Sequence, residues 1–208
     1  MQWTIAKNAE ITVEEKRSKF LAFTFYVSGE DGAMKILQTL RKKYADAKHI
    51  CYAYTIGTTE IYSRSSDDGE PAGSAGMPMQ SIIQKAKLTN VLCVVVRYFG
   101  GVLLGKSLLT RTYARAAKEA LDNSGKVVLC EAIYCQEHQS YSDFERLCAE
   151  LEMSGAWQIT KIFDADVVVS YYIKASDKER FYKMANQAGR HIEWLKTELM
   201  RMSENEER

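Results

Sequence analysis

The most constraining feature of this 208-residue chain is a break at Asn123-Ser124-Gly125, which ends a long alanine-rich helical pattern starting at Leu104. Beyond the break, a separate succession of strand and helix patterns begins. A hydrophobic fraction of 46% is enough for both parts to bury a core. We therefore predict an α+β protein with domains at 1–124 and 125–202, followed by a disordered polar tail at 203–208.

The second half has its patterns in the order βαββαβ. The predicted elements are a strand at Lys126–Cys135, a helix capped by Ser142, a hairpin of Trp157–Phe163 and Asp166–Ile173, a helix with a Ser176/Glu179 capping box, and a strand at Ile192–Leu199. This order predicts the ferredoxin-like arrangement, in which two helices cover one face of an antiparallel sheet.

The first half is organised around one strand. Val91–Tyr98 is apolar on both faces, as a central strand requires. The other predicted elements are a hairpin or one long bent strand at Ile11–Val27, a helix from Asp31 to Tyr44, strands at Ile50–Ile56 and Ile61–Tyr62, and a helix with Pro78 in its first turn.

The charge is small in total but unevenly distributed. The formal net charge is +1, whereas residues 1–124 hold 17 Lys/Arg and 12 Asp/Glu, and residues 125–208 hold 11 and 15. Arg111, Arg115 and Lys118 share one face of the alanine-rich helix; such a stripe either follows phosphates or is a solvated helix surface. Any nucleic-acid surface is therefore expected in the first half.

The chain is predicted to be cytoplasmic, without membrane contact. Its longest apolar stretch, near Val91–Val96, is far shorter than the roughly 20 residues that span a bilayer. The N-terminal residues alternate in charge and lack the apolar core of a secretory signal. Five cysteines, an odd number set mostly within apolar patterns, indicate buried free thiols in a reducing compartment.

Two segments of the first half carry candidate chemistry. Gly100–Ser107, GGVLLGKS, satisfies the P-loop pattern, but its interior is apolar, and we predict a glycine turn packed by two leucines. In SSDDGEPAGSAG, Asp67, Asp68 and Glu70 either bind a divalent cation or cap the next helix and neutralise nearby basic residues. The histidines and cysteines fit no zinc-site spacing. We predict no metal and no cofactor.

Four motifs together give the chain a resemblance to the YigZ/IMPACT family. They are KRSKF at 16–20, DAKH at 46–49, SDDGEPAGSAGMP at 66–78 and VVVRYFGGVLLG at 94–105. The resemblance implies a first domain similar to the second domain of ribosomal protein five and to domain IV of elongation factor G, an α/β sandwich. It implies a ferredoxin-like second domain similar to domain V of that factor. Family members have small residues after the final glycine, where this chain has Lys106 and Ser107.

The resemblance also implies a role in translational control, because eukaryotic members bind a ribosome-associated activator of a starvation-response kinase. It transfers no catalytic residue. It does imply a binding surface at polar and glycine positions of the motifs, to which the basic stripe is added. The predicted surface is Asp67, Asp68, Glu70, Arg97, Tyr98, Gly100, Gly101, Arg111, Arg115 and Lys118.

We therefore predict a non-enzymatic protein of translation regulation that binds RNA or the ribosome. Two alternatives remain open. One is a hydrolase or metal-dependent enzyme with its site between the DDGEPAG loop and the RYFGG turn. The other is a protein–protein interaction module that uses the acidic second domain.

Overall fold

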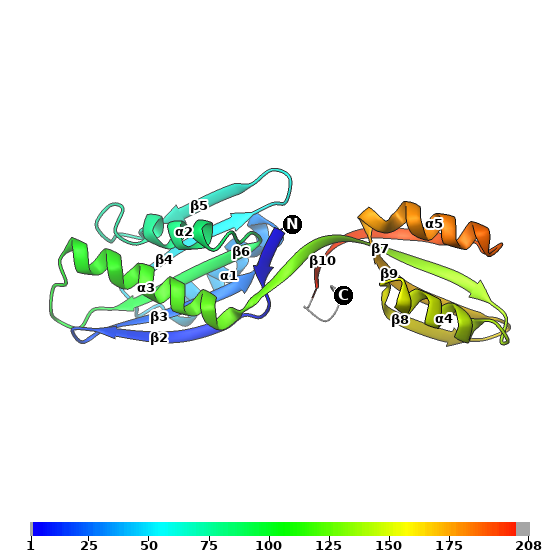
Figure 1. Ribbon diagram of the computed structural model, residues 1–208. Coiled ribbons are helices and arrows are strands. Elements are labelled where there is room, and N and C mark those ends of the chain that lie inside the picture. The colour runs from blue at the N-terminus through cyan, green and yellow to red at the C-terminus, as the bar shows by residue number, and fades with distance from the viewer. Residues whose placement is uncertain (1, 203–208) are drawn as a thin grey trace. The chain divides into compact units, whose positions relative to one another are not determined.

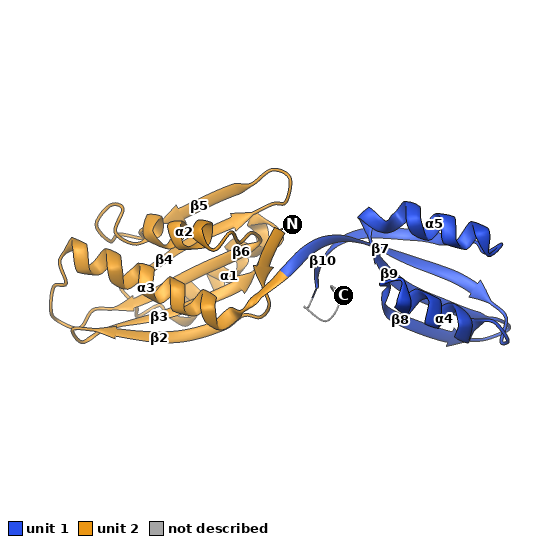
Figure 2. Ribbon diagram, in the orientation of Figure 1, with its two compact units in different colours: residues 1, 128–208 blue, residues 2–127 orange. Residues whose placement is uncertain are grey.

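The computed structural model describes residues 2–202, which form two compact units, Gln2–Val127 and a second that begins at Val128 (Figure 1, Figure 2). Each unit combines helices with a sheet whose paired strands are antiparallel. The chain is therefore an α+β protein with two antiparallel sheets. The polar tail predicted at 203–208 lies outside the described residues.

The first unit contains a five-stranded sheet in the order β2-β3-β6-β4-β5. Its elements are β1 (Gln2–Ile5), β2 (Ala9–Glu15), β3 (Ser18–Tyr26), α1 (Glu30–Lys43), β4 (His49–Ile56), β5 (Tyr62–Ser66), α2 (Gly76–Lys85), β6 (Val91–Tyr98) and α3 (Lys106–Ser124). Pro78 lies in the first turn of α2, as predicted. Helix α3 begins at Lys106, two residues later than the sequence pattern indicates.

Strand β6 is central, and its side chains alternate between two hydrophobic clusters. Val95 lies in the cluster that contains Met79 of α2 and Tyr113 of α3. The adjacent Val94 lies in the cluster that contains Leu37 of α1. Helices α2 and α3 therefore cover one face of the sheet and α1 covers the other, which explains why β6 is apolar on both sides (Figure 1).

Strands β2 and β3 form a hairpin rather than one bent strand. Glu15 pairs with Ser18, so the turn consists of Lys16 and Arg17 alone. Both turn residues have positive φ, +43° and +67°, as the two central residues of a type I′ turn require. The charged EEKRSK segment is thus a tight turn flanked by strand ends.

The second unit has the predicted βαββαβ order. Its elements are β7 (Lys126–Gln139), α4 (Phe144–Met153), β8 (Trp157–Phe163), β9 (Val167–Lys174), a short 3-10 turn (Ala175–Asp177), α5 (Lys178–Gln187) and β10 (Glu193–Met202). The strands pair in the order β10-β7-β9-β8. Leu147 of α4 and Phe181 of α5 join one hydrophobic cluster with Val169 of β9, so both helices cover the same face.

Both helix caps predicted for the second unit are wrong. Helix α4 begins after Asp143, and the Ser142 hydroxyl bonds to the Asp143 carboxylate instead of a helix N–H group. Ser176 lies inside the 3-10 turn, and α5 begins after Asp177 without a side-chain cap. Short polar side chains have several local partners, and the surrounding turn selects among them.

Four of the five cysteines are buried as free thiols, as predicted: Cys51, Cys93, Cys135 and Cys148. Cys130 is partly exposed. Burial raises the pKa of the Cys93 and Cys135 thiols to about 12. These thiols are therefore protonated at neutral pH and serve as packing groups.

Among the helices of residues 2–202, none is both long enough and apolar enough to cross a bilayer.

Candidate functional site

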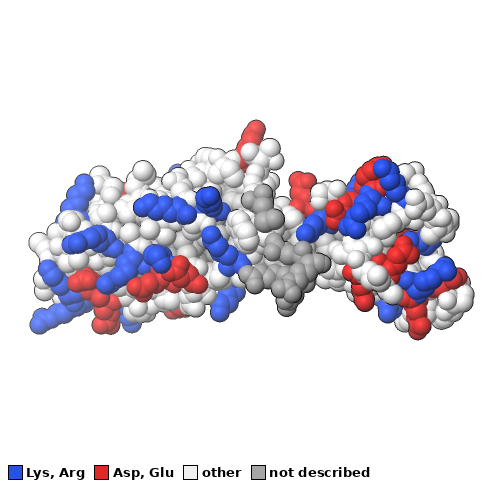
Figure 3. Space-filling view, in the orientation of Figure 1, with Lys and Arg blue, Asp and Glu red and all other residues white. Residues whose placement is uncertain are grey.

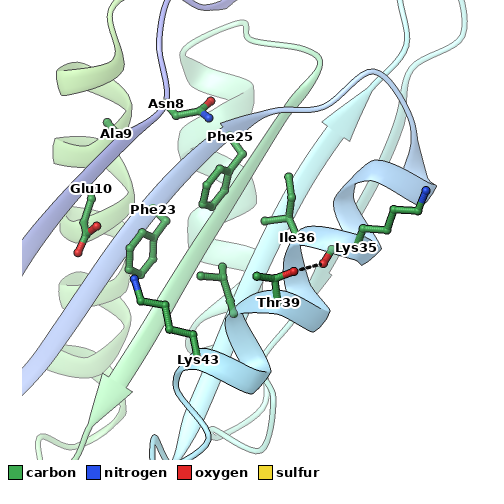
Figure 4. A pocket seen from close by; sticks show the side chains of 10 residues that line it. Asn8, Ala9, Glu10, Phe23, Phe25, Lys35, Ile36, Thr39 and Lys43 are labelled. Carbon is green, nitrogen blue, oxygen red and sulfur yellow. Dashed lines mark hydrogen bonds between the residues drawn. The ribbon is translucent and has the colours of Figure 1, made fainter.

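Two cavities of the first unit differ in the groups that line them. The larger, of about 540 Å³, lies between α1 and the strands β2 and β3, where Phe23, Phe25 and Ile36 form an apolar wall (Figure 4). Its charged groups, Glu10, Lys35 and Lys43, are all exposed at the rim, and none is buried among the apolar side chains. A binding site needs a few polar groups directed at one place, and the second cavity has them.

The second cavity, of about 390 Å³, lies where three segments meet. They are the start of β4, the loop between β5 and α2, and the connection from the end of β6 into the first turn of α3. The lining residues are Lys48, His49, Gly69, Glu70, Pro71, Arg97, Phe99, Leu103, Leu104, Gly105, Lys106 and Leu109. We call it the loop cavity, because it lies between the DDGEPAG loop and the RYFGG turn.

Asp67 holds the DDGEPAG loop in shape. Its Oδ1 accepts hydrogen bonds from the backbone N–H groups of Ala75 and Gly76 at 2.9 and 2.8 Å, and its Oδ2 accepts one from Gly73 at 2.8 Å. Gly76 is the first residue of α2, so this carboxylate caps the helix, one of the two roles considered for it. Partial burial opposes ionisation of Asp67, but the three N–H donors hold its pKa below its usual value.

We expect Asp67→Asn to be destabilising at pH 7 and nearly neutral in acid. A pKa lowered by folding contributes stability that is complete above the unfolded pKa of about 3.9 and is lost as the pH falls through the lower folded value. Urea denaturation from pH 7 to pH 2.5 should therefore show the two proteins converging below about pH 4. The control is Glu131→Gln on the exposed side of β7. A difference that stays constant with pH would contradict the assigned role.

Asp68 fixes the other side of the loop. Its carboxylate accepts hydrogen bonds from the Ile50 N–H at 2.7 Å and from the Arg41 guanidinium at 2.9 Å. Its backbone carbonyl lies 2.8 Å from Nδ1 of His49. This contact leaves Nε2 as the nitrogen of His49 nearer to Glu70, 3.9 Å from its Oε2. Asp68 is thus a structural residue that orients His49 in the cavity wall.

Glu70 and Arg97 form a buried ion pair at the floor of the loop cavity. The Arg97 Nη1 donates to Glu70 Oε1 at 2.6 Å, and the exposed fractions of the two side chains are 7% and 3%. The Tyr113 hydroxyl donates to the same Oε1 at 2.9 Å. Burial raises the pKa of Tyr113 far above its usual value, so the hydroxyl keeps its proton and remains a donor.

The three carboxylates of the loop therefore face three separate sets of donors. Residues 2–202 contain no group of three His, Cys, Asp or Glu side chains arranged to hold a metal ion. The divalent-cation role considered for Asp67, Asp68 and Glu70 conflicts with this geometry, because each carboxylate already accepts hydrogen bonds from its own set of donors.

Positive charge collects at the opening of the loop cavity. Lys48 and Lys106 line it with exposed side chains. Lys106 is also the first residue of α3, whose first turn contains no acidic residue and no side-chain cap. The first N–H groups of a helix carry a positive partial charge, so this end of α3 favours an anion.

The opening also has an apolar wall. Phe99 is 44% exposed and Leu103 85% exposed, although both carry large apolar side chains. Lys48 Nζ and the guanidinium carbon of Arg97 each lie 5.7 Å from the centre of the Phe99 ring. Cationic and aromatic groups thus stand together at one place, a combination suited to ligands with a charged part and a flat part.

Segments from all four sequence motifs meet around Arg97. Ser18 of the KRSKF motif lies 3.4 Å from Arg97 Nη2 and accepts a hydrogen bond from the Gly100 N–H at 3.2 Å. Phe20 of the same motif lies 5.4 Å from the Arg97 guanidinium and packs edge-on against Tyr113 at 5.2 Å. The motifs are far apart in the chain, and the sheet brings them together.

The basic stripe of α3 lies away from the loop cavity. All three of its side chains are exposed, but Arg115 pairs with Glu15 at 3.3 Å and Lys118 pairs with Asp122 at 2.5 Å. In Figure 3, basic and acidic side chains are interspersed over the first unit. The stripe is therefore partly neutralised, and exposed pairs of this kind hold their partners weakly.

The remaining predicted residues are Tyr98, the last residue of β6, and two glycines of the turn that follows it. Tyr98 donates a hydrogen bond to Asp46 at 2.9 Å. At Gly100, an added Cβ would lie 2.0 Å from the carbonyl carbon of Arg17, so this position requires glycine for close backbone contact. Gly101 has a φ of +84° in open space. Neither glycine is among the lining residues; both shape the turn that presents Phe99.

The GGVLLGKS segment does not have the architecture of a P-loop. The strand before it, β6, is paired with antiparallel neighbours on both sides, whereas P-loop sheets are built from parallel βα units. Leu104 is buried against the core, whereas Leu103 is exposed, so only one of the two predicted leucines packs the turn. Lys106 is exposed, yet it lines the loop cavity.

Sequence reasoning missed Lys48 and His49 as members of the site, although both belong to the DAKH motif. It also assigned no role in the site to Tyr113. A buried tyrosine hydroxyl needs a hydrogen-bond partner, and that rule was the available signal for the Glu70 contact.

Comparison with known proteins matches residues 16–121 to the Impact N-terminal domain. The "IMPACT family member YvyE" of Bacillus subtilis is 36% identical over 125 residues, which cover 60% of this chain and 58% of that protein. "IMPACT family member YigZ" of Escherichia coli is 34% identical over 144 residues, 66% of this chain and 71% of that protein. A Haemophilus influenzae family member matches over 60% of its length, so the matches span about three fifths of the Bacillus and Haemophilus proteins.

Among solved structures, a crystal structure of a hypothetical protein is 25% identical with a TM-score of 0.60, and the match covers 98% of each chain. The Impact N-terminal domain, which contains the whole loop cavity, covers just over half of this chain. This chain belongs to the IMPACT family.

Proposed function

We propose that this protein binds RNA as a non-enzymatic component of translational control, and that the loop cavity is its main contact. The observation that carries the proposal is the set of cations at that cavity, Lys48, Arg97 and Lys106, beside the uncapped N-terminus of α3. Such groups bind phosphates. The translational role rests on the family resemblance, which implies that function for eukaryotic members.

The basic excess of residues 1–124 supports RNA rather than an uncharged partner. This part of the chain holds 17 Lys/Arg and 12 Asp/Glu, and the loop cavity lies within it. Arg111, Arg115 and Lys118 provide further positive charge on α3. The weak ion pairs of Arg115 and Lys118 can exchange for phosphate contacts. The exposed Phe99 ring offers a surface on which an unpaired base can stack.

We expect Lys48→Ala and Lys106→Ala each to weaken binding of single-stranded RNA. Each should also reduce the slope of log affinity against log salt concentration by about one, because one phosphate contact is lost. The measurement is fluorescence anisotropy with labelled RNA at 50 to 200 mM salt. Lys85→Ala is the matched control, because Lys85 is exposed at the far end of α2 and does not line the cavity. Lys106→Ala should change the free energy of unfolding by less than about 0.5 kcal/mol, as exposed substitutions do.

Co-sedimentation with ribosomes tests whether the protein binds RNA within the translation apparatus.

We further propose that the two units resemble domains IV and V of elongation factor G, and that the first also resembles the second domain of ribosomal protein five. The βαββαβ order of the second unit supports the likeness to domain V. Elongation factor G should then compete with this protein for ribosomes. Absence of binding to ribosomes, tRNA and single-stranded RNA at low salt would refute the proposed function.

The protein-interaction alternative has one observation in its favour. Tyr141, Ile162 and Phe163 of the second unit are each more than half exposed, and the Tyr141 and Phe163 rings lie 6.2 Å apart. Exposed apolar clusters of this kind occur at protein interfaces. A partner that is retained after nuclease treatment and lost in Phe163→Ser would favour this alternative over RNA.

A further inference from the structure

The charges around the loop cavity leave a surplus of positive charge. Three cations line it, Lys48, Arg97 and Lys106, and they face the single carboxylate of Glu70. The other two carboxylates of the loop are directed at backbone N–H groups and at Arg41. The lining side chains therefore carry a surplus of two charges. The Asp67 carboxylate, outside the lining, lowers this surplus through its attraction to Lys106, and the N-terminus of α3 raises it. A ligand that matches this site carries about two negative charges.

Arg97 gives an independent indication of a ligand. Its side chain lines the cavity and is 7% exposed, and its Nε has no hydrogen-bond partner among the described residues. One Nη is directed at Glu70, and the other lies 3.4 Å from Ser18. A buried cation with an unpaired N–H is costly. Negative charge placed in the cavity offsets that cost.

The size and the wall of the cavity limit the ligand further. A volume of about 390 Å³ lies near the lower end of the range for small-molecule sites, roughly 300 to 1,000 Å³. One nucleotide fits this scale, and a double helix does not. Phe99 and Leu103 form an apolar wall beside the cations, where a base can rest while a phosphate reaches the lysines.

We propose that the loop cavity binds a terminal phosphate monoester on a nucleotide. At pH 7 a phosphate monoester carries a charge of about −1.5 to −2, which matches the surplus of two. An internal phosphodiester carries one negative charge and leaves the site half neutralised. Lys48, Lys106 and the first turn of α3 hold the phosphate, and the base lies against Phe99 and Leu103. This inference rests on the proposed function, because it makes the end of an RNA chain the ligand.

The test compares probes that differ only in the terminal phosphate. The full chain is titrated with five-nucleotide RNAs that end in a 5′-phosphate, a 3′-phosphate or hydroxyls at both ends, and with a nucleoside monophosphate and its nucleoside. We expect at least one phosphate-ended RNA to bind about tenfold more tightly than the hydroxyl-ended RNA, or better, as one charge-assisted contact provides. The monophosphate should likewise bind more tightly than the nucleoside.

Variants show whether the preference arises in the loop cavity. Lys48→Ala and Lys106→Ala should remove most of the tenfold preference, and Lys106→Arg should retain it, because the charge is kept. Lys85→Ala is the matched control and should leave it unchanged. Circular dichroism confirms that each variant is folded. Equal affinity for phosphate-ended and hydroxyl-ended RNA would overturn the inference, as would an equal loss in Lys85→Ala.

The outcomes separate this inference from the proposed function. Binding of RNA without regard to its ends supports the function and overturns the terminal-phosphate site. Binding of the monophosphate without binding of any RNA, tRNA or ribosome supports the site and overturns the RNA function. If no probe binds at low salt, the terminal-phosphate site is wrong, and the proposed function is wrong as well if ribosomes and tRNA also fail to bind.

Discussion

Arg97→Met is expected to lower the free energy of unfolding of the first unit by about 3 to 5 kcal/mol. The substitution leaves the Glu70 carboxylate 3% exposed, with the Tyr113 hydroxyl and His49 as its remaining neighbours. An unpaired buried charge is among the largest single causes of destabilisation. Hydrogen exchange of the β6 amides in the full chain measures opening of this unit without interference from the other.

Two controls accompany this prediction. Arg115→Met removes an exposed pair with Glu15 and should cost less than about 1 kcal/mol. Arg97→Met combined with Glu70→Gln should be less destabilising than the sum of the two single substitutions, because the pair is removed together. A cost below about 1 kcal/mol for Arg97→Met alone would show that the ion pair is dispensable.

Gly100→Ala is the second substitution with a large expected effect, about 3 kcal/mol or more. The added Cβ would lie 2.0 Å from the Arg17 carbonyl carbon and 2.4 Å from the Ser18 nitrogen. Both are backbone atoms of the β2–β3 turn, so they cannot move aside as a flexible side chain does. The turn after β6 and the hairpin must separate, and the hydrogen bond between Gly100 and Ser18 is lost.

Substitutions at two other glycines, Gly101 and Gly32, separate the effect of close backbone contact from that of backbone strain. Gly101→Ala meets open space and should cost only the strain of a positive φ, about 1 to 2 kcal/mol. Gly32→Ala in α1 has ordinary φ and open space, and should stabilise the protein by about 0.5 to 1 kcal/mol. Chemical denaturation of the three variants checks the order. If Gly100→Ala and Gly101→Ala cost the same, close approach is not the reason for glycine at 100.

Much of the fold was predictable from local patterns. The apolar run at Val91–Val96 required cover on both faces, and α1 lies on one side of it while α2 and α3 lie on the other. The βαββαβ order of the second unit followed from alternating two-residue and 3.6-residue periods. The caps at Ser142 and Ser176 were wrong, because a local hydrogen bond competes with several others of similar energy.

The candidate site was predictable only in part. The DDGEPAG and RYFGG motifs were singled out as segments with polar and glycine residues that a core does not need, and in the structure both line or shape the loop cavity. Within them, Asp67 and Asp68 turned out to hold the loop rather than to face the cavity. Lys48 and Lys106 emerged only when the sheet placed the start of β4 beside the start of α3.

By itself, the sequence determined the α+β class, the order of the elements and the motifs that mark the family, because these depend on periodicity and on residues near one another in the chain. The tertiary structure alone decided which charges are paired. Glu70 pairs with Arg97 and Tyr113, which are 27 and 43 residues away. Asp67 and Asp68 bond to other partners, so Glu70 is the one carboxylate that lines the cavity with Lys48 and Lys106. Local sequence carries no record of such distances, since strand order and helix placement set them.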